Sequence, residues 1–301
     1  MSIFESFKKI ISQFQGSDEV SKEPEYQYPY QKPSAPAPRN YEELHQLDAA
    51  KNEQNIHTEI SVDTDTYFDE PEYVELSTAE DDDVCPMCKQ FSRKIFLRAD
   101  APKLPLCPSC SCDYLYYFKE NLPPRARISH KEDFILPADC VSQFCEHQYE
   151  VFQKLDINKK IQMLEQDLEK LSEFMAPYIK AKFEAPCELA CRDLLPELYM
   201  QIGEWDKAEQ TIKLCIETQT YYPEDGSVAL SEFESYREVA AKALSYISEN
   251  PGCLQRNMYK ILPYEGLKRE QLKDFLRYSL QIRKEKYNST NKLFINTDTI
   301  V

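Results

Sequence analysis

Apolar residues recur at helical spacing through most of the chain beyond residue 138. In the stretches 140–155 and 158–179 they stand at every third or fourth position, with Asp and Asn near the start, and this predicts two amphipathic helices. One stripe is formed by Met163, Leu164, Leu168, Leu171, Phe174 and Met175. A stripe of this kind is typical of a buried core, so the pattern predicts a mainly α body.

A second pair of helices is predicted at 187–216, on either side of Gly203, because glycine ends a helix without a Cβ penalty. This stretch resembles one unit of the tetratricopeptide-repeat family, on the residues Leu195, Tyr199, Gly203, Trp205, Ala208, Ile212 and Cys215. Pro196 stands where that family has a small residue, and one copy of the pattern is found. The resemblance implies a stack in which the helices at 138–182 and 230–248 cover the faces of the pair.

Beyond Asn250-Pro251-Gly252 the pattern becomes helix, turn, helix and two strand-like arms around the turn at 287–290. This order resembles an abbreviated winged-helix unit. In that family the second helix enters the major groove and the hairpin touches the DNA backbone, although many such units contact only proteins. Residues 251–301 hold ten Lys or Arg and five Asp or Glu. The residues that the resemblance implies for nucleic-acid contact are Arg269, Lys273 and Arg277 on the second helix, and Arg283, Lys284, Lys286 and Lys292 on the hairpin.

The stretch 84–135 combines two predicted short strands, 91–97 and 113–118, with two Cys-Pro-x-Cys hooks. The hooks are Cys85–Cys88 and Cys107–Cys110, and 18 residues separate them. Four thiolates satisfy tetrahedral Zn²⁺ and leave no open position, so the spacing predicts a structural Zn²⁺ site and no metal catalysis. The unit resembles the zinc-ribbon family, with Lys89 and Ser111 where that family has Gly.

Other roles for the cysteines remain open at this point. The same four ligands suit a rubredoxin-type iron site, and each hook alone suits a redox dithiol. Cys112 can replace Cys110 as the fourth ligand or remain a free thiol. Five further residues are either ligands of a second metal site or members of a buried core: these are Cys140, Cys145, His147, Cys187 and Cys191.

The first 83 residues differ in character from the rest. Residues 1–16 place Ile3, Phe4, Phe7, Ile10, Ile11 and Phe14 at helical spacing, with Lys8 and Lys9 on the other side. This predicts an amphipathic helix that suits a partner's groove, a membrane surface or the protein's own body. Residues 17–83 contain 19 Asp or Glu and four Lys or Arg, together with many Pro and Tyr. Such a segment buries too little apolar surface to offset the entropy of ordering, so we expect a disordered acidic arm.

The composition argues against several classes of function. The 301 residues include only five Gly and four His, and neither phosphate-binding nor hydrolase motifs are present, so we expect a protein without enzymatic activity. No apolar run approaches the roughly 20 residues of a membrane span. Eleven Cys, four of them in the hooks, suit a reducing compartment, so we expect a cytoplasmic protein.

The predicted fold is a mainly α multi-domain protein. Its parts are an amphipathic helix (1–16), a disordered acidic arm (17–83), a zinc ribbon (84–135), a tetratricopeptide-like helical domain (136–250) and a winged-helix-like basic domain (251–301). The function we expect is a non-enzymatic zinc-binding adaptor or scaffold that mediates protein–protein interactions. The alternative is a nucleic-acid-binding regulator that uses the basic C-terminal unit and the zinc ribbon. The net charge of −16 weakens long-range attraction to phosphate, unless the acidic arm folds over the basic tail.

Overall fold

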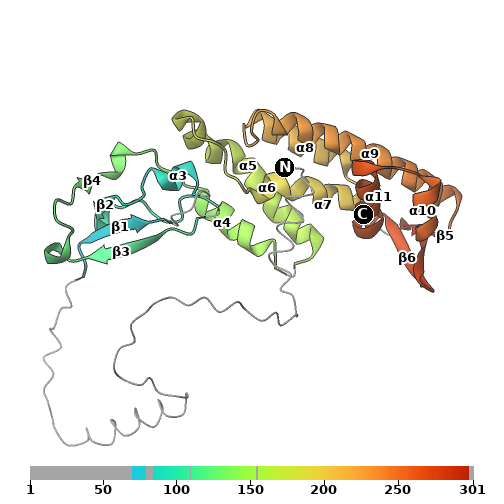
Figure 1. The fold of residues 1–301 in the computed structure, drawn as a ribbon, viewed down its shortest axis with the longest axis horizontal. Helices are drawn as coiled ribbons and strands as arrows, with labels where there is room; N and C mark the ends of the chain where they lie inside the picture. The colour runs from blue at the N-terminus through green and yellow to red at the C-terminus, as the bar shows by residue number, and fades with distance from the viewer. Residues whose placement is uncertain (1–69, 79–83, 109, 154, 298–301) are drawn as a thin grey trace, which may run out of the picture. The chain divides into compact units, whose positions relative to one another are not determined.

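A computed structural model of the chain describes residues 70–78, 84–108, 110–153 and 155–297. The predicted helix at 1–16 and the predicted arm up to residue 69 lie outside the described residues. The described part is mainly α with two small sheets, which agrees with the mainly α character that the sequence predicts, while the individual domains stay predictions. Figure 1 shows the order of these elements along the chain.

The first sheet contains four strands in the order β3-β1-β2-β4. They are β1 (Tyr73–Ser77), β2 (Ile95–Leu97), β3 (Asp113–Tyr117) and β4 (Ile128–Ser129). The pairs β1–β2 and β1–β3 are antiparallel, and β2–β4 is parallel. The predicted strands at 91–97 and 113–118 therefore contain β2 and β3.

Strand β1 corrects one prediction, because the sequence assigned residues 73–77 to the acidic arm. The structure places this strand between β2 and β3. The side chains of Val74 and Leu76 are 1% and 0% exposed, so two alternate apolar positions supply the surface that orders the segment. The acidic residues on either side of β1 concealed this short alternation.

The helices that follow are α4 (Val141–Glu150), α5 (Ile157–Ala181), α6 (Ala190–Asp193), α7 (Leu195–Ile202), α8 (Trp205–Glu217) and α9 (Asp225–Glu249). Helix α5 begins where Asp156 accepts hydrogen bonds from the backbone N–H groups of Asn158 and Lys159. Pro196 is the second residue of α7 and has no N–H to bond the preceding turn, which explains why α6 and α7 are separate. Helix α7 ends at Gly203, in the left-handed region that the predicted turn requires.

The C-terminal elements are β5 (Cys253–Leu254), α10 (Gln255–Ile261), α11 (Gly266–Tyr278), β6 (Ile282–Tyr287) and β7 (Thr290–Ile295). The three strands form a sheet in the order β5-β7-β6. Helix α11 and strand β7 both pack against α9. The helix, turn, helix and hairpin that the sequence predicts beyond residue 252 are all present.

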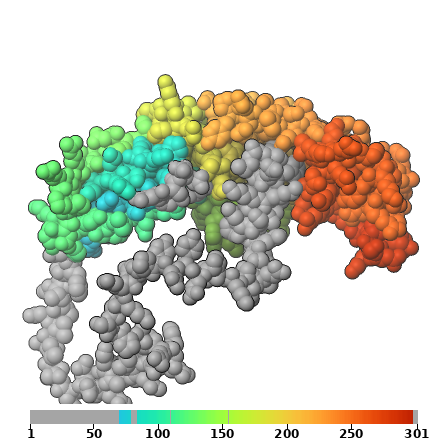
Figure 2. Space-filling model, in the orientation of Figure 1, coloured from blue at the N-terminus to red at the C-terminus, as the bar shows by residue number. Residues whose placement is uncertain are grey.

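The buried apolar residues form one connected cluster that extends from Val74 in β1 to Leu293 in β7. The predicted boundaries near residues 135 and 250 do not interrupt this core. Short elements complete the description: α3 (Pro86–Lys89) and the 3-10 turns η1 (Arg98–Asp100), η2 (Lys119–Asn121) and η3 (Lys131–Asp133). Figure 2 shows the chain in space-filling form, with the described C-terminal residues in orange to red.

Candidate metal centre and basic helix

The two cysteine hooks are shaped by short backbone turns. Cys85 caps α3, and its Sγ accepts a hydrogen bond of 3.4 Å from the backbone N–H of Cys88. Pro86 fixes the first helical position, where its missing N–H costs nothing. In the second hook the N–H of Cys110 donates to the carbonyl oxygen of Cys107 at 3.0 Å. Each hook therefore turns both of its sulfur atoms to one side.

The hooks meet at Cys88. Its Sγ lies 3.5 Å from Sγ of Cys107 and 3.6 Å from Sγ of Cys110. A disulfide would bring two sulfur atoms to about 2.05 Å, and all the cysteines are free thiols. Two groups of sulfur atoms, Cys85/Cys88/Cys107 and Cys88/Cys110/Cys112, each lie within 4.8 Å of one another and can hold a metal ion. The four predicted ligands are thus brought together, and Cys112 joins them as a fifth thiol.

The thiols of this cluster lie so close together that their pKa values shift in opposite directions. Hydrogen bonds from the Cys107 and Cys88 thiols lower the pKa of Cys85 to about 3. The thiol of Cys112 donates to Cys110, which raises the pKa of Cys112 to about 12. Hydrogen bonds to Cys107 and Cys110 also raise the pKa of Cys88. A bound cation would remove this competition, because it stabilises several thiolates at once.

Two helices support the cluster from the side of the helical body. Cys145 on α4 donates from its Sγ to the carbonyl oxygen of Cys107 at 3.3 Å. Tyr178 on α5 is 1% exposed, and its buried hydroxyl has no hydrogen-bond partner among the described residues. Burial raises the pKa of Tyr178, and the neighbouring charges of Cys85 and Cys107 raise it further.

The donor set fits a bound metal, because soft thiol ligands gather in groups that can each hold one ion. The hydroxyl of Tyr178 forms no hydrogen bond to these sulfur atoms, but it lies in the same buried core. Sequence analysis missed this contribution. Tyr178 belongs to the apolar face of α5, and no motif distinguishes it from the residues that pack beside it.

The residues considered for a second metal site do not come together. Among the described residues, no group of three ligands includes Cys140, Cys145 or His147. Nδ1 of His147 instead lies 2.7 Å from Oδ1 of buried Asp167, which also accepts from Gln143 at 2.9 Å. Cys191 is buried and Cys187 is exposed, and neither belongs to such a group. A third group, Asp100, His130 and Glu132, lies mostly at the surface.

The predicted nucleic-acid residues of the second helix share one side of α11. Arg269, Lys273 and Arg277 are exposed, whereas Leu272 and Phe275 on the opposite side are buried. Lys273 pairs with Glu270 of the same helix at 3.2 Å, and the guanidinium of Arg277 lies 5.1 Å from the ring centre of Tyr278. This side of α11 is therefore a basic surface.

The four predicted nucleic-acid residues of the hairpin differ in their contacts and exposure. Arg283 pairs with Glu285 and lies 4.7 Å from the ring centre of Phe294, and Nζ of Lys292 lies 4.5 Å from the ring centre of Tyr287. Lys284 donates to the carbonyl oxygen of Arg277 at 2.7 Å, and burial lowers its pKa. Lys286 is exposed. The bond to Arg277 turns the Lys284 ammonium group toward α11 of its own chain.

Comparison of the chain with models of protein families, with curated proteins and with solved structures finds no match. The candidate sites therefore rest on their own geometry. In the part of the chain that the structure describes, no helix combines the length and the apolar character of a membrane span.

Proposed function

We propose that the thiol cluster holds a structural Zn²⁺ ion through Cys85, Cys88, Cys107 and Cys110. In a tetrahedral Zn–S₄ site with bonds of about 2.3 Å, neighbouring sulfur atoms are about 3.8 Å apart. The separations of 3.5 and 3.6 Å around Cys88 are close to that value. Cys112 then remains outside the four ligands as a donor to one of the bound thiolates. A closed site of this kind contributes folding energy to a zinc-ribbon unit and leaves no position for a substrate.

We propose further that the protein is a non-enzymatic zinc-binding adaptor whose C-terminal unit binds duplex nucleic acid. One observation carries this proposal: α11 presents Arg269, Lys273 and Arg277 on its exposed side while its other side is fixed against α9. The order α9, β5, α10, α11, β6, β7, with the sheet β5-β7-β6, follows the winged-helix pattern. A helix held in this way fits the major groove, and a basic hairpin beside it reaches phosphates.

The proposal is tested on the full chain with a labelled duplex at about 50 and about 200 mM salt. The variant carries Arg269→Glu and Lys273→Glu. The matched control, Lys170→Glu with Lys213→Glu, makes the same change of charge on exposed positions of α5 and α8. We expect salt-sensitive binding that falls about tenfold or more in the α11 variant and changes little in the control. Absence of binding, or equal losses in both variants, would overturn the proposal.

A second candidate function, contact with a protein partner, is favoured by the first sheet. Leu97 on β2 and Leu115 and Tyr116 on β3 are 43%, 49% and 55% exposed. Among the described residues β3 is also the outer strand of the sheet, and its apolar side chains and its outer edge suit docking of an extended segment. Affinity purification from the native cell tests this, with Leu97→Ser plus Leu115→Ser as the comparison. Partners that bind the wild type and the double variant equally would contradict it.

A further inference from the structure

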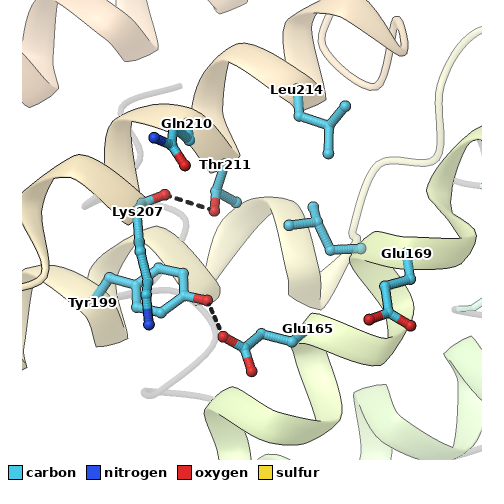
Figure 3. Close-up of a pocket in the computed structure, with 8 residues that line it drawn as sticks. Glu165, Glu169, Tyr199, Lys207, Gln210, Thr211 and Leu214 are labelled. Carbon is cyan, nitrogen blue, oxygen red and sulfur yellow. Dashed lines mark hydrogen bonds between the residues drawn. The ribbon is translucent and has the colours of Figure 1, made fainter.

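A cleft of about 560 Å³ opens between α5, α7 and α8 (Figure 3). Helix α7 packs against both of the other two helices and lies at the base of the cleft. The lining residues come from one side of each helix: Glu165, Leu168 and Glu169 from α5, Tyr199 from α7, and Lys207, Gln210, Thr211 and Leu214 from α8. On α5 and on α8 the lining side chains are three and four residues apart, so they share one side of each helix and face the cleft.

The base of the cleft is fixed and its rim is charged. Tyr199 is 3% exposed, and its hydroxyl donates to Oε1 of Glu165 at 2.5 Å. Nζ of Lys207 lies 5.5 Å from the ring centre of Tyr199. Leu168 and Leu214 are half-buried, so each leaves apolar surface uncovered. Glu169 is exposed and forms no ion pair with any described residue.

The sequence contains a segment with the complementary pattern. On a helix that advances about 100° per residue, Phe7 lies at the centre of the apolar side of residues 1–16, and Ile11 lies one turn further along the same side. Lys8 borders this side, whereas Lys9 lies almost opposite to it. An apolar stripe with one flanking cation matches an apolar cleft with carboxylates on one wall.

We propose that residues 1–16 dock in this cleft of their own chain, with Phe7 and Ile11 against Leu168 and Leu214 and with Lys8 beside Glu169. The chain between this segment and β1 is long enough for the contact. Residues 17–69 number 53, and a random coil of that length would span about 40 Å, close to the diameter of a folded unit of this size. The docked segment cannot at the same time occupy a membrane surface or a partner's groove.

A zero-length carbodiimide reaction on the full chain tests the contact directly, because it joins an amine to a carboxylate only when the two touch. Mass spectrometry of the fraction that remains monomeric is expected to find Lys8 joined to Glu169 or Glu165. Lys9 serves as the internal control, since it belongs to the same segment and faces away. Absence of a Lys8 crosslink, or crosslinks confined to the dimeric fraction, would overturn the proposal, the latter in favour of a second copy as the occupant.

Variants that exchange the charges of Lys8 and Glu169 provide an independent test, in which the rate of proteolytic cleavage is measured. Chymotrypsin cleaves after Phe4, Phe7 and Phe14, so the cleavage rate reports release of the segment without depending on its lysines. We expect Lys8→Glu and Glu169→Lys each to accelerate cleavage about threefold or more, and the two together to restore the wild-type rate. Lys9→Glu, the matched control, should leave the rate unchanged. Equal effects of Lys8→Glu and Lys9→Glu, or no rescue in the double variant, would overturn docking in this cleft.

Discussion

Glu197 is a buried carboxyl group in α7 with an unsatisfied oxygen. Glu197 is 5% exposed, and its Oε1 atom has no hydrogen-bond partner among the described residues. Burial raises the pKa of Glu197 well above its usual value, and the negative charges of Asp193 and Asp274 raise it further. A buried polar atom without a partner costs about 1–3 kcal/mol, so this residue reduces the stability of the fold at neutral pH.

The raised pKa predicts a pH-dependent gain from Glu197→Gln. The folded state holds a proton on Glu197 more tightly than the unfolded state does, whose pKa is about 4.3. The contribution of Glu197 to the free energy of unfolding is therefore fully present below the unfolded-state pKa, and it is lost as the pH rises through the pKa that Glu197 has in the folded state. We expect Glu197→Gln to raise the free energy of unfolding by about 1–3 kcal/mol at pH 7 and by less at pH 5, as measured in denaturant titrations.

The exposed residue Glu217 provides the control for this prediction, because Glu217→Gln makes the same chemical change outside the core. Its effect is expected to be small and equal at the two pH values. A gain from Glu197→Gln that does not depend on pH would show that the carboxyl is not the titrating group.

At the residue scale, the sequence predicts which thiols come together better than it predicts the surroundings of those thiols. The four thiols of the hooks are found from their spacing, because a hook brings its two cysteines to one side by local backbone geometry alone. Cys145 on α4 bonds Cys107 of the cluster, and Tyr178 on α5 lies in the same core; only the packing of those helices places them there. For Lys284 the sequence predicts a cation exposed for nucleic-acid contact, but in the structure its ammonium group donates to a backbone carbonyl of its own chain.

At the scale of elements, the turn between α7 and α8 also contacts the segment that joins α11 to β6. Gly203 has φ +90°, and a Cβ atom placed there would lie 2.9 Å from Cδ of Gln281. Gln281 in turn donates to the carbonyl oxygen of Met200 at 3.3 Å, and the N–H of Leu280 donates to the carbonyl oxygen of Gln201 at 2.9 Å. The turn is therefore restricted both by its own conformation and by a close neighbour.

Gly203→Ala is predicted to destabilise the protein by about 1–2 kcal/mol through the left-handed conformation, with a smaller addition for displacing the flexible end of the Gln281 side chain. Gly266→Ala is a matched comparison. Gly266 has φ +54°, but nothing lies within 4 Å of a Cβ atom there, so only the conformational cost applies. Thermal unfolding should separate the two variants, and equal losses would mean that the contact with Gln281 contributes nothing.

Element boundaries were predictable where a single residue sets them. Gly203 and Asp156 mark a helix end and a helix start in the sequence, and the structure uses both in that way. The break at Pro196 could be read only as a departure from a repeat pattern, although it divides one expected helix into α6 and α7. Strand β1 was missed because its stability comes from pairing with β2 and β3, which are distant along the chain.

At the scale of the whole molecule, the continuous core joins the thiol cluster to the helical body. Cys88 and Cys107 belong to the same buried cluster as Phe174 and Tyr178 of α5. Gln90, just after the first hook, donates to the carbonyl oxygen of Ile135 at 2.7 Å and accepts from the N–H of Ile135 at 3.1 Å. Loss of the proposed Zn²⁺ ion is therefore expected to weaken the helices as well as the sheet.

Metal removal is predicted to lower the midpoint of helix unfolding by about 5–15 °C, since structural Zn²⁺ supplies folding energy. The measurement is the helical circular dichroism signal of the full chain, under reducing conditions, before and after chelation. Cys107→Ser should reproduce the shift, because it removes a ligand. Cys187→Ser, an exposed cysteine outside the cluster, is the control. An unchanged helical transition after verified metal loss would show that the cluster and the helices unfold independently.

The position of β1 matters for any dissection of the gene. A fragment that starts at Val84 retains every cysteine, yet it deletes β1, which among the described residues is the one strand that pairs with β3. It also removes Glu72, whose carbonyl oxygen accepts from the N–H of Arg98 at 2.8 Å. In a deletion series planned from the cysteine spacing, a loss of stability or activity would therefore be attributed to the missing acidic segment, although its cause is the removal of a strand from the β-sheet. Informative truncations must start before residue 70.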